Sequence, residues 1–253
     1  MKVSAVVISH GQADLLERSL PALAAQVEEV VVVANVPGSA GALPANARLL
    51  ESSRPRGYAA NANAGCALAT GEAIALANPD AVPREGALAA LAAFMASRPR
   101  CGIAGPQLLY PDGSWQPSRR RFPTVFGTVV RRTPIRRAFD PKRFQRRHYH
   151  LDERPVEPVE ADWMLGGFLL LRRSMLEELR GLDEGFRLYG EDIDLAYRAA
   201  RAGWERWYVP SAVVEHAYAA VIDERFLTRR TLWHLRGMLR FVRKHPERLR
   251  ALW

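Results

Sequence analysis

The chain has 253 residues, of which 48% are hydrophobic and 25% charged, enough for one large α/β domain or two small ones and unlike a disordered protein. It contains no run of about 18 apolar residues and no basic-then-apolar leader, so we expect neither a membrane-spanning helix nor export. Cys66 and Cys101 stand alone, outside any metal-ligand or disulfide-framework spacing, which suits a reducing compartment. Each is expected to be a small core residue.

The net charge of +9 is concentrated in two segments. Residues 117–150 contain 11 Arg or Lys and one acidic residue, and residues 225–253 contain 9 and one. The rest of the chain carries a net charge of −9. Two basic segments on an acidic body indicate a surface for an anionic partner, and a membrane, a lipid diphosphate and a nucleic acid all qualify.

The first hundred residues alternate strand-like and helix-like segments. We predict strands at 3–9, 29–34, 47–52 and 72–77, and helices at 13–23, 58–70 and 84–97. Near-continuous apolar strands between helices predict a mostly parallel sheet that is covered on both faces. Because ligands of such sheets bind at the carboxyl ends of the strands, the candidate site residues are Ser9-His10-Gly11, Asn35 and Asn78-Pro79-Asp80.

The pattern changes after residue 110. The sequence YPDGSW predicts a hairpin turn, and the Arg- and Pro-rich stretch that follows predicts an irregular loop over 117–150. Regular structure is expected again in a strand at 161–173 that contains a glycine pair, in the helix that follows it, and in two short strands at 205–210 and 212–217. The last 28 residues predict a basic amphipathic helix.

Three carboxylates occur within four residues in GEDIDL, at 190–195. Acidic side chains in the first turn of a helix interact favourably with its partial positive charge, which alone would explain Glu191 and Asp194. Asp192 projects roughly 100° away from Glu191, so it could face a cleft while the helix buries another side. That buried side is expected to be Ile193, Ala196, Tyr197 and Ala200. Like-charge repulsion would raise the pKa of at least one carboxyl, as suits a proton acceptor.

Other polar residues each have a functional and a structural interpretation. Asp80 follows a buried strand and could bind a divalent cation that also carries phosphate oxygens, or it could simply turn the chain. Asn61 and Asn63 stand in an Ala-rich helix after the flexible Gly57, and could cap the helix or bind a sugar or nucleotide. His216 could be a metal ligand or a structural histidine.

The order of six segments carries a family resemblance: VSAVVISHGQADLLERSLPAL, RGYAANANAG, ALANPDA, GGFLLLRR, GLDEGFRLYGEDIDLAYRAARAGW and VEHAYAA. Over residues 3–245 it resembles the family 2 inverting glycosyltransferases of the GT-A fold, especially bacterial rhamnosyltransferase-like members. The resemblance implies a Rossmann-like central sheet flanked by helices, with a small antiparallel acceptor-side sheet. It divides the chain into a nucleotide-sugar-binding half (1–105), an acceptor-binding half (106–220) of the same domain, and a C-terminal amphipathic helix (221–253).

The resemblance also implies roles for individual residues. Asp80 would hold Mg²⁺ or Mn²⁺ on the donor's diphosphate, with His216 close to the metal, and Asp192 would be the catalytic base with Glu191 supporting it. The nucleotide sugar would lie near Ser9, Asn35, Gly57, Asn61, Asn78 and Asp80, and the acceptor near Gly166, Gly167 and Asp194. Asn35 and Asn78 stand where the family usually has acidic residues, which leaves the nucleotide and the metal affinity open.

The implied activity is that of a hexosyltransferase in cell-envelope polysaccharide biosynthesis. It would move a sugar, rhamnose being one candidate, from a dTDP- or UDP-sugar to a glycan or polyprenyl-diphosphate-linked acceptor. Its expected location is the cytoplasm, including the inner face of the cell membrane, and nucleic acid is not an expected partner.

Three alternatives remain open. A nucleotidyltransferase would normally need a basic phosphate-binding loop, and SHGQADLL has no Lys or Arg before Arg18. A nucleic-acid-binding protein would explain the charge but not GEDIDL. A catalytically inactive relative would be consistent with Asn35 and Asn78.

The basic tail has its own pair of interpretations. Leu232, Leu235, Leu239 and Val242 follow helical spacing within 229–245, while most of the Arg and Lys residues lie elsewhere around the helix. Such a helix could lie on an anionic bilayer surface, or it could pack on its own domain and leave a basic side in solvent.

Overall fold

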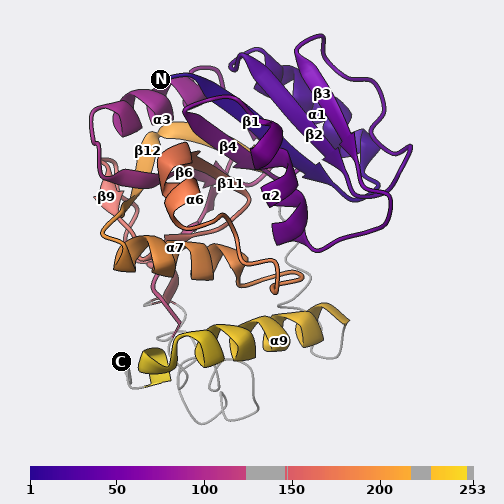
Figure 1. Ribbon diagram of the computed structural model, residues 1–253. Coiled ribbons are helices and arrows are strands. Elements are labelled where there is room, and N and C mark those ends of the chain that lie inside the picture. The colour runs from indigo at the N-terminus through magenta and orange to yellow at the C-terminus, as the bar shows by residue number, and fades with distance from the viewer. Residues whose placement is uncertain (124–145, 147, 218–228, 250–253) are drawn as a thin grey trace.

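A computed structural model of the chain describes residues 1–123, 146, 148–217 and 229–249 (Figure 1). The strands are β1 (Val3–Ser9), β2 (Glu29–Ala34), β3 (Ala47–Glu51), β4 (Ala73–Ala77), β5 (Ala81–Pro83), β6 (Cys101–Leu109), β7 (Trp115–Gln116), β8 (Arg119–Arg120), β9 (Val159–Glu160), β10 (Trp163–Met164), β11 (Phe168–Arg172) and β12 (Glu205–His216). The helices are α1 (Ala13–Ala24), α2 (Tyr58–Leu68), α3 (Ala87–Ala96), α6 (Arg173–Glu178), α7 (Glu191–Arg201) and α9 (Arg229–Lys244), with a short 3₁₀ helix at Pro246–Leu249.

One large sheet organises the described residues, in the order β3-β2-β1-β4-β11-β6-β12-β5. Strands β1 to β4 are parallel to one another, β11 runs antiparallel between β4 and β6, and β12 is parallel to β6. Strands β8 and β10 form a separate antiparallel pair. The predicted fold class, a mostly parallel sheet flanked by helices with a small antiparallel sheet, is confirmed.

Both faces of the sheet are buried, and alternate residues of each strand point to opposite sides. In β1, Val3 and Val7 belong to the core beneath α1 and α3. Val6 and Ile8 belong to the core beneath α2, α6 and α7. Gly65 lets α2 approach closely, because a Cβ there would lie 2.5 Å from Val6 Cγ1. This close approach holds the N-terminus of α2 near the ends of β1 and β2.

Several predicted elements differ in detail from the observed ones. The strand expected at 161–173 is two strands, β10 and β11, separated by Gly166 and Gly167. The two strands expected at 205–217 are the single strand β12, whose pairing with β6 is irregular between Val209 and Val213. The hairpin is confirmed, with Leu109 of β6 opposite Trp115 of β7.

Some predictions fall only partly on the described residues. Within the loop predicted at 117–150, residues 119–120 form β8, and residues 124–145 and 147 lie outside the described part. The C-terminal helix predicted at 221–253 is described from residue 229 to 244, and residues 221–228 and 250–253 lie outside the described part. The predicted boundary at residue 105 falls within β6, so the two halves share one continuous sheet.

The two cysteines occupy core positions, as expected. Cys101 is buried and Cys66 is partly buried. Burial raises the pKa of the Cys66 thiol and of the Cys101 thiol to about 12 in each case. Neither thiol is therefore ionised near neutral pH, which makes both poor nucleophiles.

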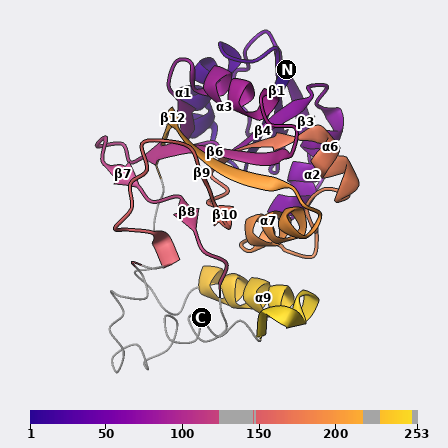
Figure 2. The same cartoon turned by 90° about the vertical axis from the view of Figure 1, so that its left-hand side faces the viewer.

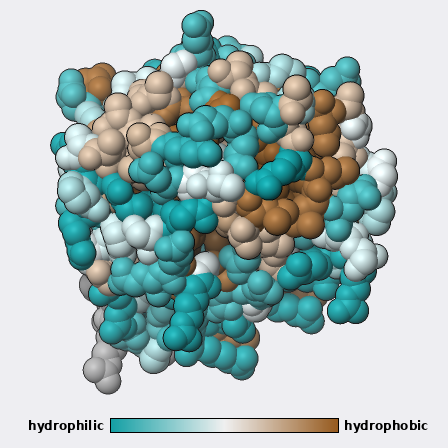
Figure 3. All heavy atoms as spheres, turned by 45° about the horizontal axis from the view of Figure 1, so that its top comes forward, coloured by the Kyte–Doolittle hydropathy of each residue, from teal (hydrophilic) through white to brown (hydrophobic). Residues whose placement is uncertain are grey.

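Helix α9 lies beside α7, at the end of the molecule away from β1 to β4 (Figures 1 and 2). Its buried side consists of Met238 and Phe241, which belong to the core beneath α7. The helix thus packs on its own domain, but through a different face from the one that carries Leu232, Leu235 and Leu239. Figure 3 shows the upper part of the molecule, away from α9, where hydrophilic residues surround a hydrophobic area on the right of the view.

Candidate active site

Asp80 and His216 are brought together by the pairing of two strands. Asp80 follows β4 and precedes β5, and the antiparallel pairing of β5 with β12 places Ala81 opposite His216. Asp80 Oδ1 lies 3.5 Å from His216 Nε2, and the Asn78 side-chain nitrogen lies 3.4 Å from the same ring atom. The three residues that the family resemblance assigns to the metal and the donor diphosphate therefore form one group.

The orientation of the His216 ring is set by Gln116, a buried residue of β7 that the sequence analysis did not identify. Gln116 Oε1 lies 2.9 Å from His216 Nδ1, and Gln116 Nε2 donates to the His216 carbonyl oxygen at 3.5 Å. Because a carbonyl oxygen can only accept, this second contact fixes which way the amide points. Oε1 then accepts from Nδ1–H, which leaves Nε2 as an acceptor 3.4 Å from the Asn78 amide nitrogen and 3.5 Å from Asp80 Oδ1.

The surroundings of the His216 ring favour its neutral form. Burial lowers its pKa, and the Asp80 carboxylate only partly opposes this effect. Two acceptor atoms, Asp80 Oδ1 and His216 Nε2, thus face each other across 3.5 Å. Neighbouring ligands of an octahedral cation with bonds of about 2.1 Å lie about 3.0 Å apart, so a small shift of either side chain would fit a divalent cation between them.

The donor set is typical of a cation that substrate phosphates also coordinate. Within residues 1–123, 146, 148–217 and 229–249, no group of three or more His, Cys, Asp or Glu side chains could enclose a metal ion. Mg²⁺ in nucleotide sites is usually held by one or two carboxylates together with phosphate oxygens and water. Asp80 and His216 therefore suit a cation that arrives with a diphosphate.

Gly166 and Gly167, between β10 and β11, connect the group formed by Asn78, Asp80 and His216 with the acidic turn, GEDIDL at residues 190–195. The Asn78 N–H donates to the Gly167 carbonyl at 2.9 Å, and the Gly166 N–H donates to Asp192 Oδ2 at 3.2 Å. Gly167 has no room for a side chain, because a Cβ there would lie 2.7 Å from His216 Nε2. Two adjacent residues thus connect the segment that carries Asp80 with Asp192.

Glu191 and Asp192 form a pair of carboxyl groups with raised pKa values. Burial, and then the charge of Asp192, raises the pKa of Glu191 to about 8. Burial also raises the pKa of Asp192, although hydrogen bonds from the Ile193 and Gly166 amides oppose it. Glu191 is 8% exposed and its Oε2 has no hydrogen-bond partner among the described residues. Asp192 is the more exposed of the two and is therefore the better placed to meet a substrate.

Tyr58 is a second residue of the site that the sequence analysis did not identify. Its hydroxyl is buried without a hydrogen-bond partner among the described residues. Burial, followed by the charges of Glu191 and Asp192, raises the pKa of this phenol well above its usual range. A neutral phenol beside the acidic pair is a ready hydrogen-bond donor. The sequence signal was its position directly after Gly57, at the start of α2.

The predicted nucleotide-side residues are mostly bonded to the protein itself. Asn35 Oδ1 accepts from the Arg56 N–H at 2.7 Å and its amide nitrogen donates to the Arg56 carbonyl at 3.0 Å. Ser9 Oγ accepts from the Gln12 N–H at 3.2 Å. Asn61, which is 1% exposed, accepts from Ser52 Oγ at 3.0 Å. These contacts hold the loops around the ends of β1 and β2, and a direct contact with a nucleotide stays a prediction.

Gly57 and Asn63 connect α2 to the loop that precedes α7. Gly57 has only 3.1 Å between a built Cβ and the Arg187 backbone, and the Tyr58 N–H donates to the Arg187 carbonyl at 2.9 Å. Asn63 exchanges hydrogen bonds with the backbone of Leu182. Gly57 and Asn63 therefore position the acidic turn relative to the N-terminal half.

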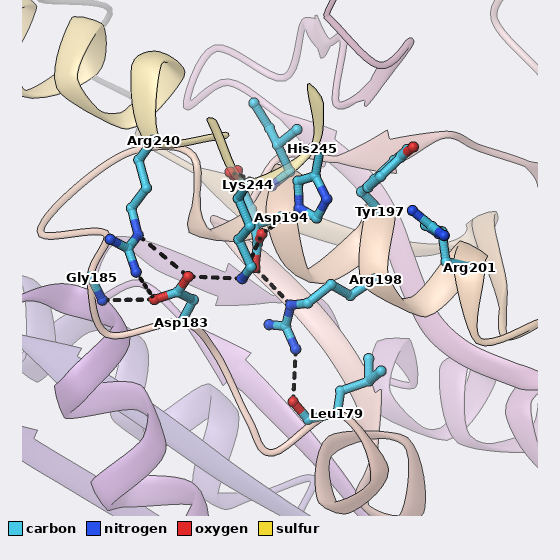
Figure 4. Close-up of polar contacts among 12 residues, drawn as sticks. Leu179, Asp183, Gly185, Asp194, Tyr197, Arg198, Arg201, Arg240, Lys244 and His245 are labelled. Atoms are coloured by element: carbon cyan, nitrogen blue, oxygen red, sulfur yellow. Dashed lines mark hydrogen bonds and ion pairs between the residues drawn. The ribbon is translucent and has the colours of Figure 1, made fainter. Parts of the chain in front are cut away.

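The prediction that Asp194 contacts the acceptor is not compatible with its surroundings. Its side chain is fully buried, and its oxygens pair with Arg198 Nε at 2.7 Å, Lys244 Nζ at 2.9 Å and His245 Nε2 at 2.8 Å (Figure 4). The cause is α9, which covers this side of α7 and which the sequence pattern could not place. Asp194 fastens α9 to α7, and an acceptor has no access to it.

The family model described as glycosyltransferase like family 2 matches residues 2–239. The N-acetylglucosaminyl-diphospho-decaprenol L-rhamnosyltransferase of Mycobacterium tuberculosis (strain ATCC 25618 / H37Rv) is 32% identical over 238 residues, covering 83% of this chain and 74% of that protein. Rhamnosyltransferase WbbL of Escherichia coli (strain K12) is 37% identical over 82 residues, which are 32% of this chain and 31% of that protein.

Two solved structures share the fold at low sequence identity. GalNAc-T7 with UDP, GalNAc and Mn²⁺ has a TM-score of 0.69 and 16% identity, over 96% of this chain and 48% of that one. The mannosyltransferase PcManGT from Pyrobaculum calidifontis with GDP-Man and Mn²⁺ has a TM-score of 0.61 and 20% identity, over 96% of this chain and 64% of that one. The chain thus spans about half to two thirds of the length of these structures.

Proposed function

We propose that this chain, which belongs to glycosyltransferase-like family 2, transfers a sugar with inversion from a nucleoside diphosphate sugar to a lipid-linked or glycan acceptor. The observation that supports the proposal is the link through Gly166 and Gly167, whose backbone groups bond to Asn78, two residues before Asp80, and to Asp192. Rhamnose is the favoured sugar because a relative that is 32% identical over 83% of the chain is named a rhamnosyltransferase. A dTDP- or UDP-sugar is the favoured donor.

On the donor side, Asp80 and His216 are the residues that would hold Mg²⁺ or Mn²⁺, with Asn78 beside them. When bound, such a cation supplies Lewis-acid stabilisation of the departing diphosphate. The chain's own contribution is to keep the His216 ring neutral and oriented through Gln116. It also supplies the Asp80 carboxylate at the edge of the sheet.

On the acceptor side, Asp192 is the base. The acceptor hydroxyl oxygen forms a bond to the anomeric carbon while the bond from that carbon to the diphosphate oxygen breaks, and the hydroxyl proton goes to the Asp192 carboxylate. The Gly166 N–H holds one oxygen of this carboxylate, and the raised pKa of Asp192 makes it a stronger base than an exposed aspartate. Glu191 and the Tyr58 phenol complete its surroundings.

The acceptor class follows from the same relative, whose name specifies a diphospho-decaprenol substrate. We infer a polyprenyl-diphosphate-linked acceptor in cell-envelope polysaccharide synthesis, reached from the cytoplasm at the inner face of the cell membrane. No helix among the described residues is both long and apolar enough to cross a bilayer.

A ligand screen followed by a transfer assay tests the proposal. The melting temperature is measured with dTDP-, UDP- and GDP-sugars, with and without Mn²⁺, for the wild type and Asp80→Asn. We expect one sugar nucleotide to stabilise the wild type in a Mn²⁺-dependent way, and the variant to lose that dependence. Product is then sought with a polyprenyl-diphosphate sugar acceptor.

The remaining outcomes identify the alternatives. Stabilisation without transfer would favour an inactive sugar-nucleotide-binding protein. No response to any sugar nucleotide, together with salt-sensitive DNA binding, would favour a nucleic-acid-binding protein. Formation of a sugar nucleotide from a sugar phosphate and a nucleoside triphosphate would favour a nucleotidyltransferase.

A further inference from the structure

Helix α9 has two apolar faces, and only one of them is buried. Met238 and Phe241 are 8% and 1% exposed and pack into the core beneath α7. Leu232, Leu235 and Leu239 are 47%, 46% and 50% exposed. Their spacing of three and four residues places them on one stripe along the helix. These three residues are called the leucine stripe below.

Positive charge borders the leucine stripe. At 100° per residue, Arg236 and Arg243 lie within about 40° of Leu232 around the helix axis, and both are exposed. Arg240 and Lys244 point elsewhere, because both bind Asp183. The stripe is therefore an apolar strip with cations at one edge, an arrangement that suits an interfacial helix on anionic lipid.

A different side of α9 contacts the segment around GEDIDL, residues 190–195. Arg240 and Lys244 bind Asp183, which precedes Glu191 and Asp192 in the sequence (Figure 4). Lys244 and His245 bind Asp194, which follows them. Gly237 packs directly on the Tyr189 carbonyl. Tyr189 has a φ of 70°, an unfavourable backbone conformation for a residue with a side chain. The contacts of α9 thus lie on both sides of Asp192 in the sequence, from Asp183 to Asp194.

We propose that the leucine stripe docks α9 on an anionic lipid bilayer, so that the helix holds the acidic turn next to the membrane surface. This inference deepens the proposed function and rests on it for the lipid-linked acceptor, whose diphosphate lies at the same surface. A second copy of the chain is a weaker occupant. In a two-fold pairing of the stripes, Arg236 and Arg243 would come close to the same residues of the other copy.

Vesicle co-sedimentation tests the surface directly. The triple variant Leu232→Ser/Leu235→Ser/Leu239→Ser is compared with Leu49→Ser/Leu68→Ser, which alters leucines that are 44% and 41% exposed on β3 and α2. With phosphatidylglycerol vesicles at low salt, we expect the triple variant to bind at least about tenfold more weakly than the wild type. The control should bind as the wild type does. Equal binding by the triple variant and the wild type would overturn the proposal.

Charge and self-association provide independent arms. Arg236→Glu/Arg243→Glu should lose binding to phosphatidylglycerol vesicles even if the triple variant fails to fold, and the wild type should bind phosphatidylcholine vesicles more weakly. Light scattering after size exclusion gives the oligomeric state. A wild-type dimer that becomes monomeric in the triple variant would assign the stripe to a second copy and overturn the bilayer.

Donor binding separates this inference from the proposed function. The sugar-nucleotide thermal shift involves no lipid, and we expect it to be the same in the triple variant and the wild type. Loss of vesicle binding with an unchanged donor shift supports the docking surface. If the wild type bound vesicles through the leucine stripe but bound no sugar nucleotide, the proposed function would be refuted. The lipid-docking surface would still be supported.

Discussion

The two halves of the site use carboxylates in opposite ways. At the end of β4, Asp80 faces a neutral histidine nitrogen 3.5 Å away, so two electron-rich atoms share a space that a cation would stabilise. At the start of α7, Glu191 and Asp192 crowd together in a buried position, and their pKa values rise. In the proposed reaction, the first half would hold a cation and the second would accept a proton. An inverting transfer needs these two functions at opposite ends of one sugar.

The largest effect should come from removing the base. We expect Asp192→Asn to reduce transfer by about 10²–10⁴-fold, because an amide cannot accept the acceptor proton. Donor binding in the thermal-shift assay should stay close to wild type, since the cation half is intact. Asp112→Asn, in the exposed β6–β7 turn, is the matched control. Near-full transfer by a folded Asp192→Asn protein would show that the base lies elsewhere.

The next substitution tests whether Asp194, in the same turn as Asp192, takes part in transfer or only in stability. Asp194→Asn should lower the free energy of unfolding by about 3 kcal/mol, because Arg198, Lys244 and His245 lose a buried charged partner. We expect the loss in urea denaturation, with transfer per folded molecule reduced far less than in Asp192→Asn. A stable Asp194→Asn protein with abolished transfer would show that Asp194 takes part in the reaction.

The role of the Asp80 and His216 half can be tested at Gln116, which orients the His216 ring. Gln116→Met removes the acceptor for His216 Nδ1–H, so the ring loses the contact that directs Nε2 towards Asp80. We expect Mn²⁺ affinity in the presence of a nucleoside diphosphate to fall by about 10–100-fold, as is usual for residues that orient a metal-binding histidine. Calorimetric titration measures this without turnover. Gln107→Met, on β6, is the control, and unchanged Mn²⁺ affinity in Gln116→Met would exclude the orienting role.

The smallest effect is a change in how stability depends on pH. The folded-state pKa of Glu191, about 8, lies above its ordinary value of 4.5. Between these values the unfolded chain releases a proton that the folded chain retains, so stability falls as the pH rises. Glu191→Gln cannot ionise and should escape this fall. We expect its melting temperature, relative to wild type, to be higher at about pH 9 than at about pH 5.

A parallel response of the wild type and Glu191→Gln across that range would mean that Glu191 titrates normally. The base half would then lack the proton-retaining pair that distinguishes it from the cation half. The same scan on Asp192→Asn adds a further check, because removing the Asp192 charge removes one of the causes that raise the pKa of Glu191.

Local sequence determined much of this protein. Apolar runs and their spacing identify the strands and helices of the N-terminal half, because burial on both faces of a parallel sheet leaves a direct mark on composition. The ends of those strands pointed to Asp80, which the structure places beside His216. GEDIDL identified the acidic turn, whereas the close approach of Gly167 to the His216 ring is visible only in the structure.

Only the tertiary structure decided which polar groups meet. Gln116 and His216 are 100 residues apart, and Asp194 and His245 are 51 apart, so no periodicity links either pair. Helical spacing likewise showed that α9 has a leucine stripe, but not that Met238 and Phe241 would be the side that packs. Periodicity reports which residues share a face, because it depends on backbone geometry alone. Which partner covers that face depends on the packing of distant segments, and this is why the fate of Asp192 and Asp194, two residues apart, could be separated only in three dimensions.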